Sequence, residues 1–141
     1  EAVGDSILTE ERIDKLVKFV GSYLEDGYVF QTNLRQLLKG KKGDCSEHAL
    51  LFCALARSLG IPCREITGLV YMGDWCQGFG LHAWNEVNLD GRWRAVDASW
   101  GTSKISPVYI RFPDDVYDQA QLIDSVHKMG INIERVEYIN E

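Results

Sequence analysis

The stretch KKGDCSEHALLFCALARSLGIP, residues 41–62, predicts the helix on which the rest of the fold is built. Asp44 can act as the N-cap of this helix, and Glu47, three positions later, can complete a capping box. Apolar side chains follow at helical spacing, on a stripe broad enough to pack against a sheet. The Gly-Ile-Pro sequence at the end of the stretch stops the helix. Cys45 therefore falls at the first helical position, where a loop becomes a buried helix.

The hydrophobic pattern changes its period along the chain, from helical spacing to alternation. We expect helices over residues 9–25 and 33–38, and a later helix over residues 115–129. Alternation predicts strands over residues 63–72, 80–89, 92–99, 106–112 and 131–139. Helices followed by an antiparallel sheet indicate an α+β fold. We expect one domain over residues 1–141, with a helical part over about 9–60 and a sheet part over about 63–141.

The composition limits the classes of function. The chain has 141 residues, of which 45 % are hydrophobic and 26 % charged, and its net charge is −6. These values suit a soluble globular domain with a substantial core. The acidic balance gives no electrostatic attraction to nucleic acid or to an anionic membrane, and no apolar run is long enough to insert across a bilayer. The chain does not begin with Met, so we expect it to be part of a longer protein; its oligomeric state stays open.

A turn in the second half of the chain predicts how two strands pair. The Asp-Gly sequence at residues 90–91 favours a two-residue hairpin, in which paired residue numbers sum to 181. Trp84 then faces Asp97, and His82 faces Ser99. His82 and Asp97 become diagonal neighbours on one face of the sheet, with their backbones about 7–8 Å apart. A carboxylate placed in this way can hold a catalytic histidine in one tautomer.

Cys45 has the position that a nucleophilic thiol requires. The thiolate is the reactive form of cysteine, and the unpaired N–H groups and partial positive charge of a helix N-terminus stabilise it. An adjacent imidazolium stabilises it further. The backbone N–H of Cys45 can also donate to an oxyanion. A lone cysteine at a helix start is more often structural, so the prediction of a catalytic triad rests on Cys45, His82 and Asp97 together.

Three segments of the chain resemble a known family. GDCSEHALLFCALARSLGIPCREITGLVY, LHAWNEV and GRWRAVDAS look like the transglutaminase-like core of the papain-like cysteine enzyme superfamily, in its bacterial, proposed cysteine protease branch. The resemblance implies a papain-like fold with the nucleophile helix packed on the sheet. It also implies that Cys45 is the nucleophile, that His82 is the general base and then the acid, and that Asp97 orients His82. Members cleave or exchange amide-type bonds through a thioester.

The sequence departs from two branches of this family. Animal transglutaminases use a tryptophan upstream of the cysteine to stabilise the oxyanion, and here no tryptophan precedes Trp75. Gln31 is the first candidate for that role, with Asn33 and Tyr28 as alternatives. The acidic calcium loops of the animal enzymes and the C-x-x-C zinc motifs of peptide N-glycanases are also missing. These differences favour a simpler hydrolase, such as a peptidase.

Four aromatic residues are candidates for a substrate groove: Tyr71, Trp75, Trp84 and Trp100. Aromatic side chains near strand ends are more often core packing, so packing is the alternative for each of them. Trp84 shares the predicted face of His82, and it can also shield a histidine–aspartate hydrogen bond from water.

The other sulfur and imidazole groups have structural interpretations. Cys53 lies on the apolar helix stripe and is expected in the core. Cys63 and Cys76 flank a predicted strand and are candidates for a disulfide if the protein is exported. His48 is expected to be a buried histidine with its hydrogen bond satisfied. The cysteines form no C-x-x-C pair, so we expect no metal site.

Together these features predict a cysteine-dependent amide-bond hydrolase or acyl transferase that needs no cofactor. Its expected partner is a peptide or protein substrate. One alternative is a protein-glutamine transglutaminase, in which a lysine amine resolves the thioester. The other is an inactive binding module that keeps the fold. The compartment stays open, although the resemblance to bacterial members favours an exported location over a cytoplasmic one.

Overall fold

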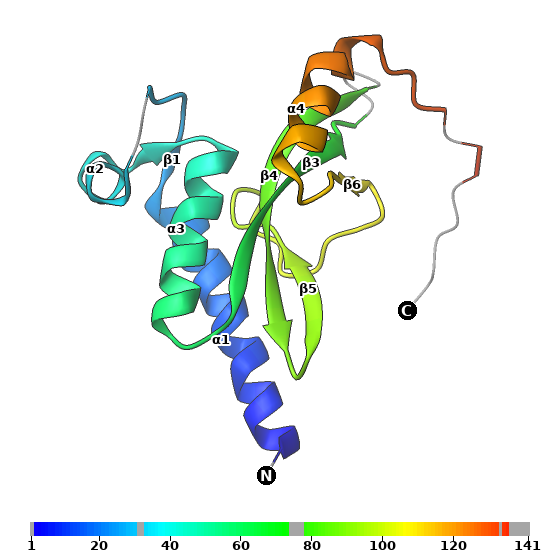
Figure 1. Cartoon of the computed structure of the whole chain (residues 1–141). Coiled ribbons are helices and arrows are strands. Elements are labelled where there is room, and N and C mark those ends of the chain that lie inside the picture. The colour runs from blue at the N-terminus through cyan, green and yellow to red at the C-terminus, as the bar shows by residue number, and fades with distance from the viewer. Residues whose placement is uncertain (1, 31–32, 74–77, 133, 136–141) are drawn as a thin grey trace. The chain divides into compact units, whose positions relative to one another are not determined.

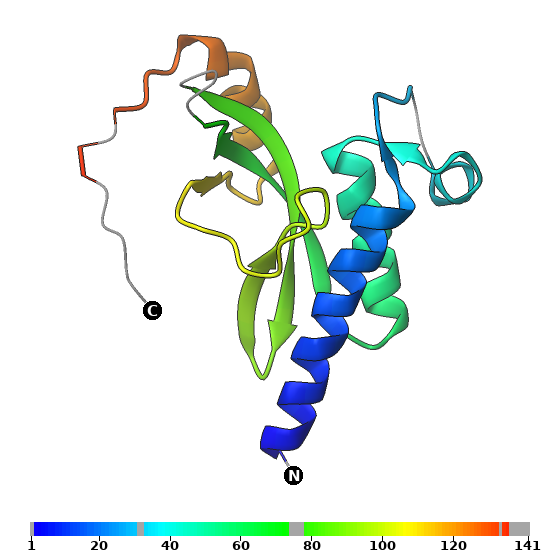
Figure 2. The ribbon, with the colours of Figure 1, turned by 180° about the vertical axis from the view of Figure 1, so that it is seen from behind.

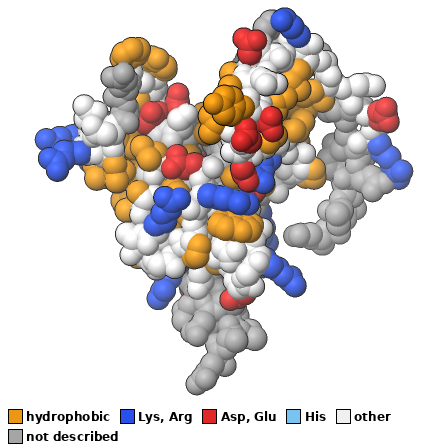
Figure 3. All heavy atoms as spheres, in the orientation of Figure 1, with side chains coloured by type: hydrophobic (Ala, Val, Ile, Leu, Met, Phe, Trp, Pro, Cys, Tyr) orange, Lys and Arg blue, Asp and Glu red, His pale blue; other side chains and the backbone are white. Residues whose placement is uncertain are grey.

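The computed structural model describes residues 2–30, 33–73, 78–132 and 134–135 (Figure 1). They fall into two compact units, Glu1–Arg111 and Phe112–Glu141, and each unit is described by itself. No described helix is both long enough and apolar enough to cross a membrane. On the face seen in Figure 3, basic and acidic side chains are interspersed, with no single basic patch.

The first unit combines helices with an antiparallel sheet. Its elements are α1 (Ala2–Tyr23), β1 (Glu25–Asp26), α2 (Leu34–Gly40), β2 (Lys42–Gly43), α3 (Cys45–Ser58), β3 (Cys63–Tyr71), β4 (Phe79–Leu89), β5 (Arg92–Val96) and β6 (Tyr109–Arg111). Four of the strands form one antiparallel sheet in the order β5-β4-β3-β6. The other two, β1 and β2, form a small parallel pair. The predicted α+β class is confirmed. The strand expected over 106–112 is shorter, and the first helix begins and ends earlier than the expected 9–25.

The start of α3 has the local structure that its sequence predicts. The Asp44 side chain accepts a hydrogen bond from the Ser46 N–H at 2.8 Å, and the Glu47 carboxylate accepts one from the Asp44 N–H at 2.9 Å. Gly43, in β2, leaves room for the Glu47 side chain, because a Cβ at Gly43 would lie 2.3 Å from the Glu47 Cβ. The capping box and β2 together fix where α3 begins, and therefore where Cys45 lies.

The main core lies between the helices and one face of the sheet. α1 and α3 pack against each other, and α3 packs on β3 and β4, as Figure 2 shows from behind. Each fully buried aliphatic side chain in this core stabilises the fold by roughly 1.5–3 kcal/mol. The core residues are Ile13, Leu16, Val17, Val20, Leu24, Leu37, Leu51, Phe52, Cys53, Ala56, Ile61, Cys63, Val87, Leu89, Val96 and Ala98.

The β4–β5 hairpin has the predicted register over its whole ladder. Asn85 pairs with Val96 and Leu89 with Arg92, so that each pair sums to 181. The turn residues have the positive φ angles of a type I′ turn, 51° at Asp90 and 80° at Gly91.

The ladder ends one residue before the expected pair of Trp84 and Asp97. Instead the backbone of Asp97 pairs with Thr102: the Asp97 N–H donates to the Thr102 carbonyl at 2.7 Å, and the Thr102 N–H donates back at 2.8 Å. The prediction of cross-strand pairs at Asp97 and Ser99 was therefore wrong. The physical reason is that a tight turn over residues 98–101 satisfies these backbone groups locally.

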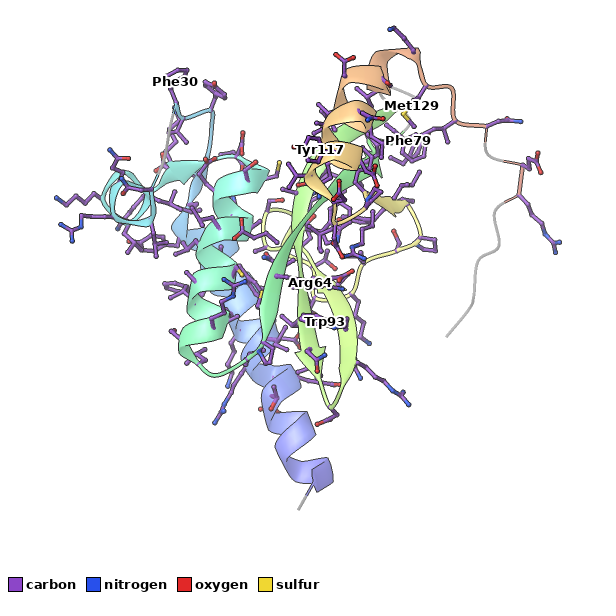
Figure 4. The ribbon with its side chains drawn as sticks, viewed as in Figure 1. Phe30, Arg64, Phe79, Trp93, Tyr117 and Met129 are labelled. Atoms are coloured by element: carbon purple, nitrogen blue, oxygen red, sulfur yellow. The ribbon has the colours of Figure 1, made fainter. Side chains whose placement is uncertain are left out.

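The sheet face opposite α3 carries polar and aromatic groups. Side chains alternate along β4, so His82, Trp84 and Glu86 project away from the face that holds Val87. Glu86 pairs with Arg64 at 2.6 Å, and the Arg64 guanidinium lies 4.2 Å from the centre of the Trp93 ring (Figure 4). This ion pair and stacked ring cover the sheet near the hairpin, and His82 and Trp84 lie further along β4.

The second unit contains α4 (Val116–Ser125) and a single 3-10 turn, η1 (Val126–Lys128). The Asp115 side chain caps α4 by accepting from the N–H groups of Tyr117 and Asp118. The strand expected over residues 131–139 does not form in its described part, residues 131–132 and 134–135. These residues are exposed, and an alternating pattern gains nothing from a strand when neither face becomes buried.

Candidate active site

Cys45 lies at the first position of α3 with a half-buried thiol. The first turn of α3 lies beside β4 (Figures 1 and 2), and the Cys45 thiol interacts with the imidazole of His82 closely enough to raise the pKa of His82. Asn85 joins the same two elements, because its buried side-chain amide donates to the Ala49 carbonyl of α3 at 3.0 Å. The N-terminus of α3 presents N–H groups without an intrahelical acceptor and a partial positive charge beside the Cys45 side chain.

His82 and Asp97 form a buried pair. The His82 Nε2 lies 2.7 Å from the Asp97 Oδ2, and the two residues are 7 % and 1 % exposed. A carboxylate can only accept, so Nε2 donates and carries a proton. Nδ1 is then the ring nitrogen that remains for Cys45. The imidazole therefore bridges the thiol and the carboxylate, although the strand pairing expected at Asp97 does not form.

The surroundings favour a positively charged His82 and a negatively charged Asp97. Burial acts to lower the pKa of His82, but its hydrogen bonds to Asp97 and Cys45 and the charges of both groups outweigh burial and raise that pKa to about 9. Burial acts to raise the pKa of Asp97, but hydrogen bonds from His82, Ser99 and Tyr109 hold it below its usual value. The pair is therefore expected to stay ionised through the neutral range.

Asp97 accepts hydrogen bonds at both carboxylate oxygens. The N–H and the hydroxyl of Ser99 donate to Oδ1 at 2.9 and 2.7 Å, and the N–H of Trp100 donates to it at 3.2 Å. His82 and the Tyr109 hydroxyl both donate to Oδ2, at 2.7 and 2.8 Å. These bonds compensate the burial of the charge and fix the direction in which Oδ2 points.

Aromatic rings surround the His82 imidazole. The ring centres of Trp100, Tyr109 and Trp84 lie 4.8, 6.0 and 6.3 Å from the imidazole centre. Trp84 is 2 % exposed, so it packs beneath His82 and excludes water from the histidine–aspartate bond, in line with the shielding alternative. Trp100 is 47 % exposed, so one face of this ring cluster is open to solvent.

The structure does not bring all the predicted groove residues together. Tyr71 lies three residues beyond Gly68, which pairs with His82, so its side chain projects to the other face of the sheet. There its ring centre lies 5.5 Å from that of Phe79. Trp75 and the oxyanion candidate Gln31 lie outside the described residues.

The remaining sulfur and imidazole groups are buried away from this arrangement. The thiol of Cys53 is in the core as predicted and interacts with the thiol of Cys63, and burial raises the pKa of both. Cys63 is a free cysteine, and its proposed disulfide partner, Cys76, lies outside the described residues. His48 is buried, and its Nδ1 donates to the Asp44 carbonyl at 2.7 Å, as expected for a satisfied histidine.

Two residues of the site were missed by sequence reasoning. Ser99 was placed opposite His82 but was given no role, and Tyr109 was only assigned to a strand. An aspartate side chain often accepts a hydrogen bond from the backbone N–H two residues later, in an Asx turn. The sequence Asp97-Ala98-Ser99 could therefore have indicated a role for Ser99. Nothing local indicates Tyr109, because its approach to Asp97 depends on the pairing of β6 with β3.

Comparison with known proteins identifies the family. A family model described as the transglutaminase-like superfamily matches residues 7–98. The human kyphoscoliosis peptidase is 31 % identical over 87 residues, which are 54 % of this chain and 12 % of that protein. The LIM and transglutaminase domain protein ltd-1 of Caenorhabditis elegans is 28 % identical over 91 residues, 60 % of this chain and 13 % of that protein. The chain thus matches about an eighth of the length of these relatives.

Two solved structures share the fold. A proposed cysteine protease from Cytophaga hutchinsonii aligns with a TM-score of 0.57 at 24 % identity, over 70 % of this chain and 34 % of that one. A TGase aligns with a TM-score of 0.51 at 15 % identity, over 84 % of this chain and 35 % of that one. Both confirm the expected papain-like, transglutaminase-core architecture. Because the family model matches most of the chain, from α1 through the β4–β5 hairpin, this protein belongs to the transglutaminase-like superfamily.

Proposed function

We propose that this domain is a cysteine-dependent amide-bond hydrolase or acyl transferase in which Cys45, His82 and Asp97 act as a triad. The observation that carries the proposal is that the His82 imidazole interacts both with the Cys45 thiol and with the buried Asp97 carboxylate, to which it donates at 2.7 Å. A residue set that only maintained the fold would not need a half-buried thiol aligned with a buried ion pair. Membership of the superfamily supports the proposal without fixing the reaction.

In the proposed mechanism, the proton of the Cys45 thiol has already passed to the His82 Nδ1 in the resting site, and the thiolate sulfur attacks the carbonyl carbon of an amide. The Cys45 N–H donates to the oxyanion of the tetrahedral intermediate. His82 then gives its proton to the nitrogen of the leaving amine, the C–N bond breaks, and a thioester remains on Cys45. Water, deprotonated by His82, releases the acid and restores the thiol. If an amine attacks instead, a new amide forms.

The free edge of β4 supports a polypeptide substrate in an extended conformation. The Asn88 N–H donates to the Pro62 carbonyl at 2.8 Å, and the Met72 N–H donates to the Gly78 carbonyl at 2.9 Å. Hydrogen-bonded pairs alternate in an antiparallel ladder, so the even-numbered residues of β4 bond to β3 and the odd-numbered residues point to the opposite edge.

β5 occupies that opposite edge only from Asn85 onward. The backbone groups of Leu81 and Ala83, on either side of His82, therefore point to an open edge. Within the described ranges no acceptor or donor faces them, and Leu81 is 48 % exposed. A peptide that adds to this edge as a strand would run past His82 at one strand spacing, about 4.8 Å. This geometry fits a peptide or protein substrate better than a small amide.

Alkylation of Cys45 by iodoacetamide tests the triad. Labelling is followed residue by residue with mass spectrometry from pH 4 to 9, in the wild type and in His82→Ala. We expect rapid labelling that persists to about pH 5 in the wild type, as for histidine-paired thiolates, and slow labelling that rises only near pH 8–9 in the variant. Slow labelling that does not depend on His82 would leave only an ordinary thiol and would refute the proposed activity.

Hydrolysis and amine transfer are then separated with one peptide library. Release of new termini from unmodified peptides reports hydrolysis, and incorporation of a fluorescent amine into glutamine peptides reports transfer, with Cys45→Ala as the control for both. Hydrolysis is expected to dominate. If the thiol is activated but neither product forms, and Cys45→Ala binds a partner as the wild type does, the non-catalytic binding module is the correct alternative.

A further inference from the structure

Tyr109 and His82 donate to the same oxygen of Asp97. The Tyr109 hydroxyl lies 2.8 Å from Oδ2, and the His82 Nε2 lies 2.7 Å from it. The three donors at Oδ1 come from the turn that follows Asp97 in sequence. Tyr109 is different, because it is contributed by β6, on the other side of β3 from β4. Its hydrogen bond is therefore a contact between distant segments of the chain, and it is made to Oδ2, the same Asp97 oxygen that accepts from His82.

The Tyr109 ring is held in place by the sheet and by its neighbours. Tyr109 pairs with Val70 on β3, two residues from Gly68, which pairs with His82, so both side chains project from the same face. The ring meets Trp84 edge-on at 5.2 Å and Trp100 edge-on at 5.9 Å between centres. These edge-on contacts restrict the rotation of the Tyr109 ring and favour the position in which its hydroxyl reaches Oδ2.

The phenol remains a donor over the working pH range. Burial and the adjacent Asp97 carboxylate both raise the pKa of Tyr109 above its usual value, so the hydroxyl keeps its proton. A hydrogen bond from a neutral hydroxyl stabilises the carboxylate and makes it a weaker base, which agrees with its contribution to the lowered pKa of Asp97. A weaker base attracts the His82 proton less strongly.

We propose that Tyr109 is a positioning residue whose hydroxyl shares Oδ2 with His82, fixing the carboxylate and withholding part of its negative charge from the imidazole. The role in catalysis rests on the proposed function of the triad, but the electrostatic role does not. In the triad, this sharing keeps the imidazolium a strong enough acid to protonate the leaving amine. Without it, His82 would hold its proton more tightly and give it up more slowly.

The test is the titration of His82, followed by NMR of protein labelled in its three histidines. It is made in the Cys45→Ala background, so that neither turnover nor thiol ionisation contributes. Tyr109→Phe keeps the ring and removes the hydroxyl, and we expect the pKa of His82 to rise by about half a unit or more. A pKa of His82 that stays the same or falls would overturn the proposal and leave Tyr109 as a packing residue.

Two further proteins complete the experiment. Tyr23→Phe removes a tyrosine hydrogen bond that involves neither Asp97 nor His82, from the Tyr23 hydroxyl to the Leu38 carbonyl at 2.9 Å, and should leave the titration of His82 unchanged. Difluorotyrosine at position 109 keeps the ring and donates more strongly, so it should lower the pKa of His82. This second substitution keeps the proposal testable even if Tyr109→Phe fails to fold, because a rise or no change would contradict it.

The activity readout distinguishes the two proposals. If the triad is active, Tyr109→Phe with Cys45 intact should lower kcat severalfold with little change in KM and move the alkaline limb of the pH profile upward. If the NMR shift occurs but the wild type cleaves and transfers nothing, the electrostatic role of Tyr109 stands and the enzymatic function fails. If the wild type is active and the pKa shift of His82 is absent, the enzymatic function stands and the electrostatic role of Tyr109 fails.

Discussion

The His82 Nε2 donates to the Asp97 Oδ2 over 2.7 Å, across a separation of 15 residues in sequence. The hairpin ladder carries the chain from β4 back along β5, and the turn after Val96 then bends the backbone of Asp97 onto Thr102. The side chain of Asp97 still reaches back to β4. The pair thus depends on the register of the hairpin for its position and on the turn at residues 97–102 for its final geometry.

This ion pair makes stability depend on pH. The pKa of His82 is raised in the folded protein, from 6.5 to about 9, so the folded state binds more protons than the unfolded state between these values. The stabilisation is therefore full below about pH 6.5 and is lost as the pH rises through 9. At about 1.4 kcal/mol per pH unit, it amounts to roughly 3 kcal/mol. The lowered pKa of Asp97 has the opposite effect on the pH dependence of stability. Its stabilisation of the fold is present at neutral pH and is lost when the pH falls below the usual carboxyl range.

Urea unfolding at a series of pH values measures this dependence. The free energy of unfolding of the wild type should fall between pH 6.5 and 9 relative to that of His82→Gln, which cannot bind the extra proton. The difference between the two curves cancels the titration of the buried thiols, which both proteins share. Parallel curves over this range would show that the pKa of His82 is not raised.

Asp97→Asn should abolish the proposed activity while leaving the domain folded. The amide cannot accept from Nε2 with the same strength and can donate to it, so the imidazole would lose the tautomer that presents Nδ1 to Cys45. We expect kcat to fall by about 10³–10⁴, as for other triads that lose their carboxylate. Ser99→Ala is the matched control, because it removes one donor to Oδ1 and leaves Oδ2 unchanged, and its kcat should fall by less than about tenfold. Equal losses in both variants would contradict the orienting role of Oδ2.

Gly68→Ala should displace residues that pack against His82 and Asp97. A Cβ at Gly68 would lie 2.1 Å from the Ile110 carbonyl oxygen and 2.6 Å from the Trp84 ring, so β6 or Trp84 must move. We expect a loss of stability of about 1–3 kcal/mol from overpacking. Thermal unfolding measures it, and Gly40→Ala, at the end of α2 with nothing within 4 Å of the new Cβ, should have little effect. Equal unfolding temperatures for the two variants would mean that β6 adapts freely.

The described thiols should differ sharply in reactivity. Cys53 and Cys63 are 1 % and 5 % exposed, and burial raises the pKa of both thiols, whereas Cys45 is half-buried at a helix N-terminus. Iodoacetamide at neutral pH should therefore label Cys45 in the native protein and label Cys53 and Cys63 only after denaturation. Peptide mapping reads all three sites in one sample. Native labelling of Cys63 at the rate of Cys45 would show that the core around β3 opens readily.

Much of the site could be predicted because two of its parts are encoded locally. The capping box of Asp44 and Glu47 fixes the start of α3 through contacts within four residues, and this places Cys45. The Asp-Gly turn at residues 90–91 fixes the hairpin register, and the alternation of side chains along β4 places His82 on the same face as Trp84. Local hydrogen bonds of this kind form in the same way in any tertiary context, so a sequence pattern is enough to recognise them.

Contacts between distant segments could not be read from the sequence in this way. The pairing of β6 with β3, the position of Tyr109 against Asp97 and the contact between the thiols of Cys53 and Cys63 all join segments whose order in the chain says little about their distance in space. The strand expected over 131–139 does not form in its described residues, 131–132 and 134–135, because an alternating pattern states a preference for a strand without supplying a partner strand.

The sequence by itself determined where α3 begins, the β4–β5 hairpin and the α+β class, since each follows from hydrogen bonds and hydrophobic periodicity over a few neighbouring residues. Only the tertiary structure decided that Asp97 turns onto Thr102, that Trp84 is buried beneath His82 and that Tyr109 shares the oxygen of Asp97 with His82. These contacts depend on which side chains become buried against one another. The packing of the whole sheet decides that, and no single stretch of the chain does.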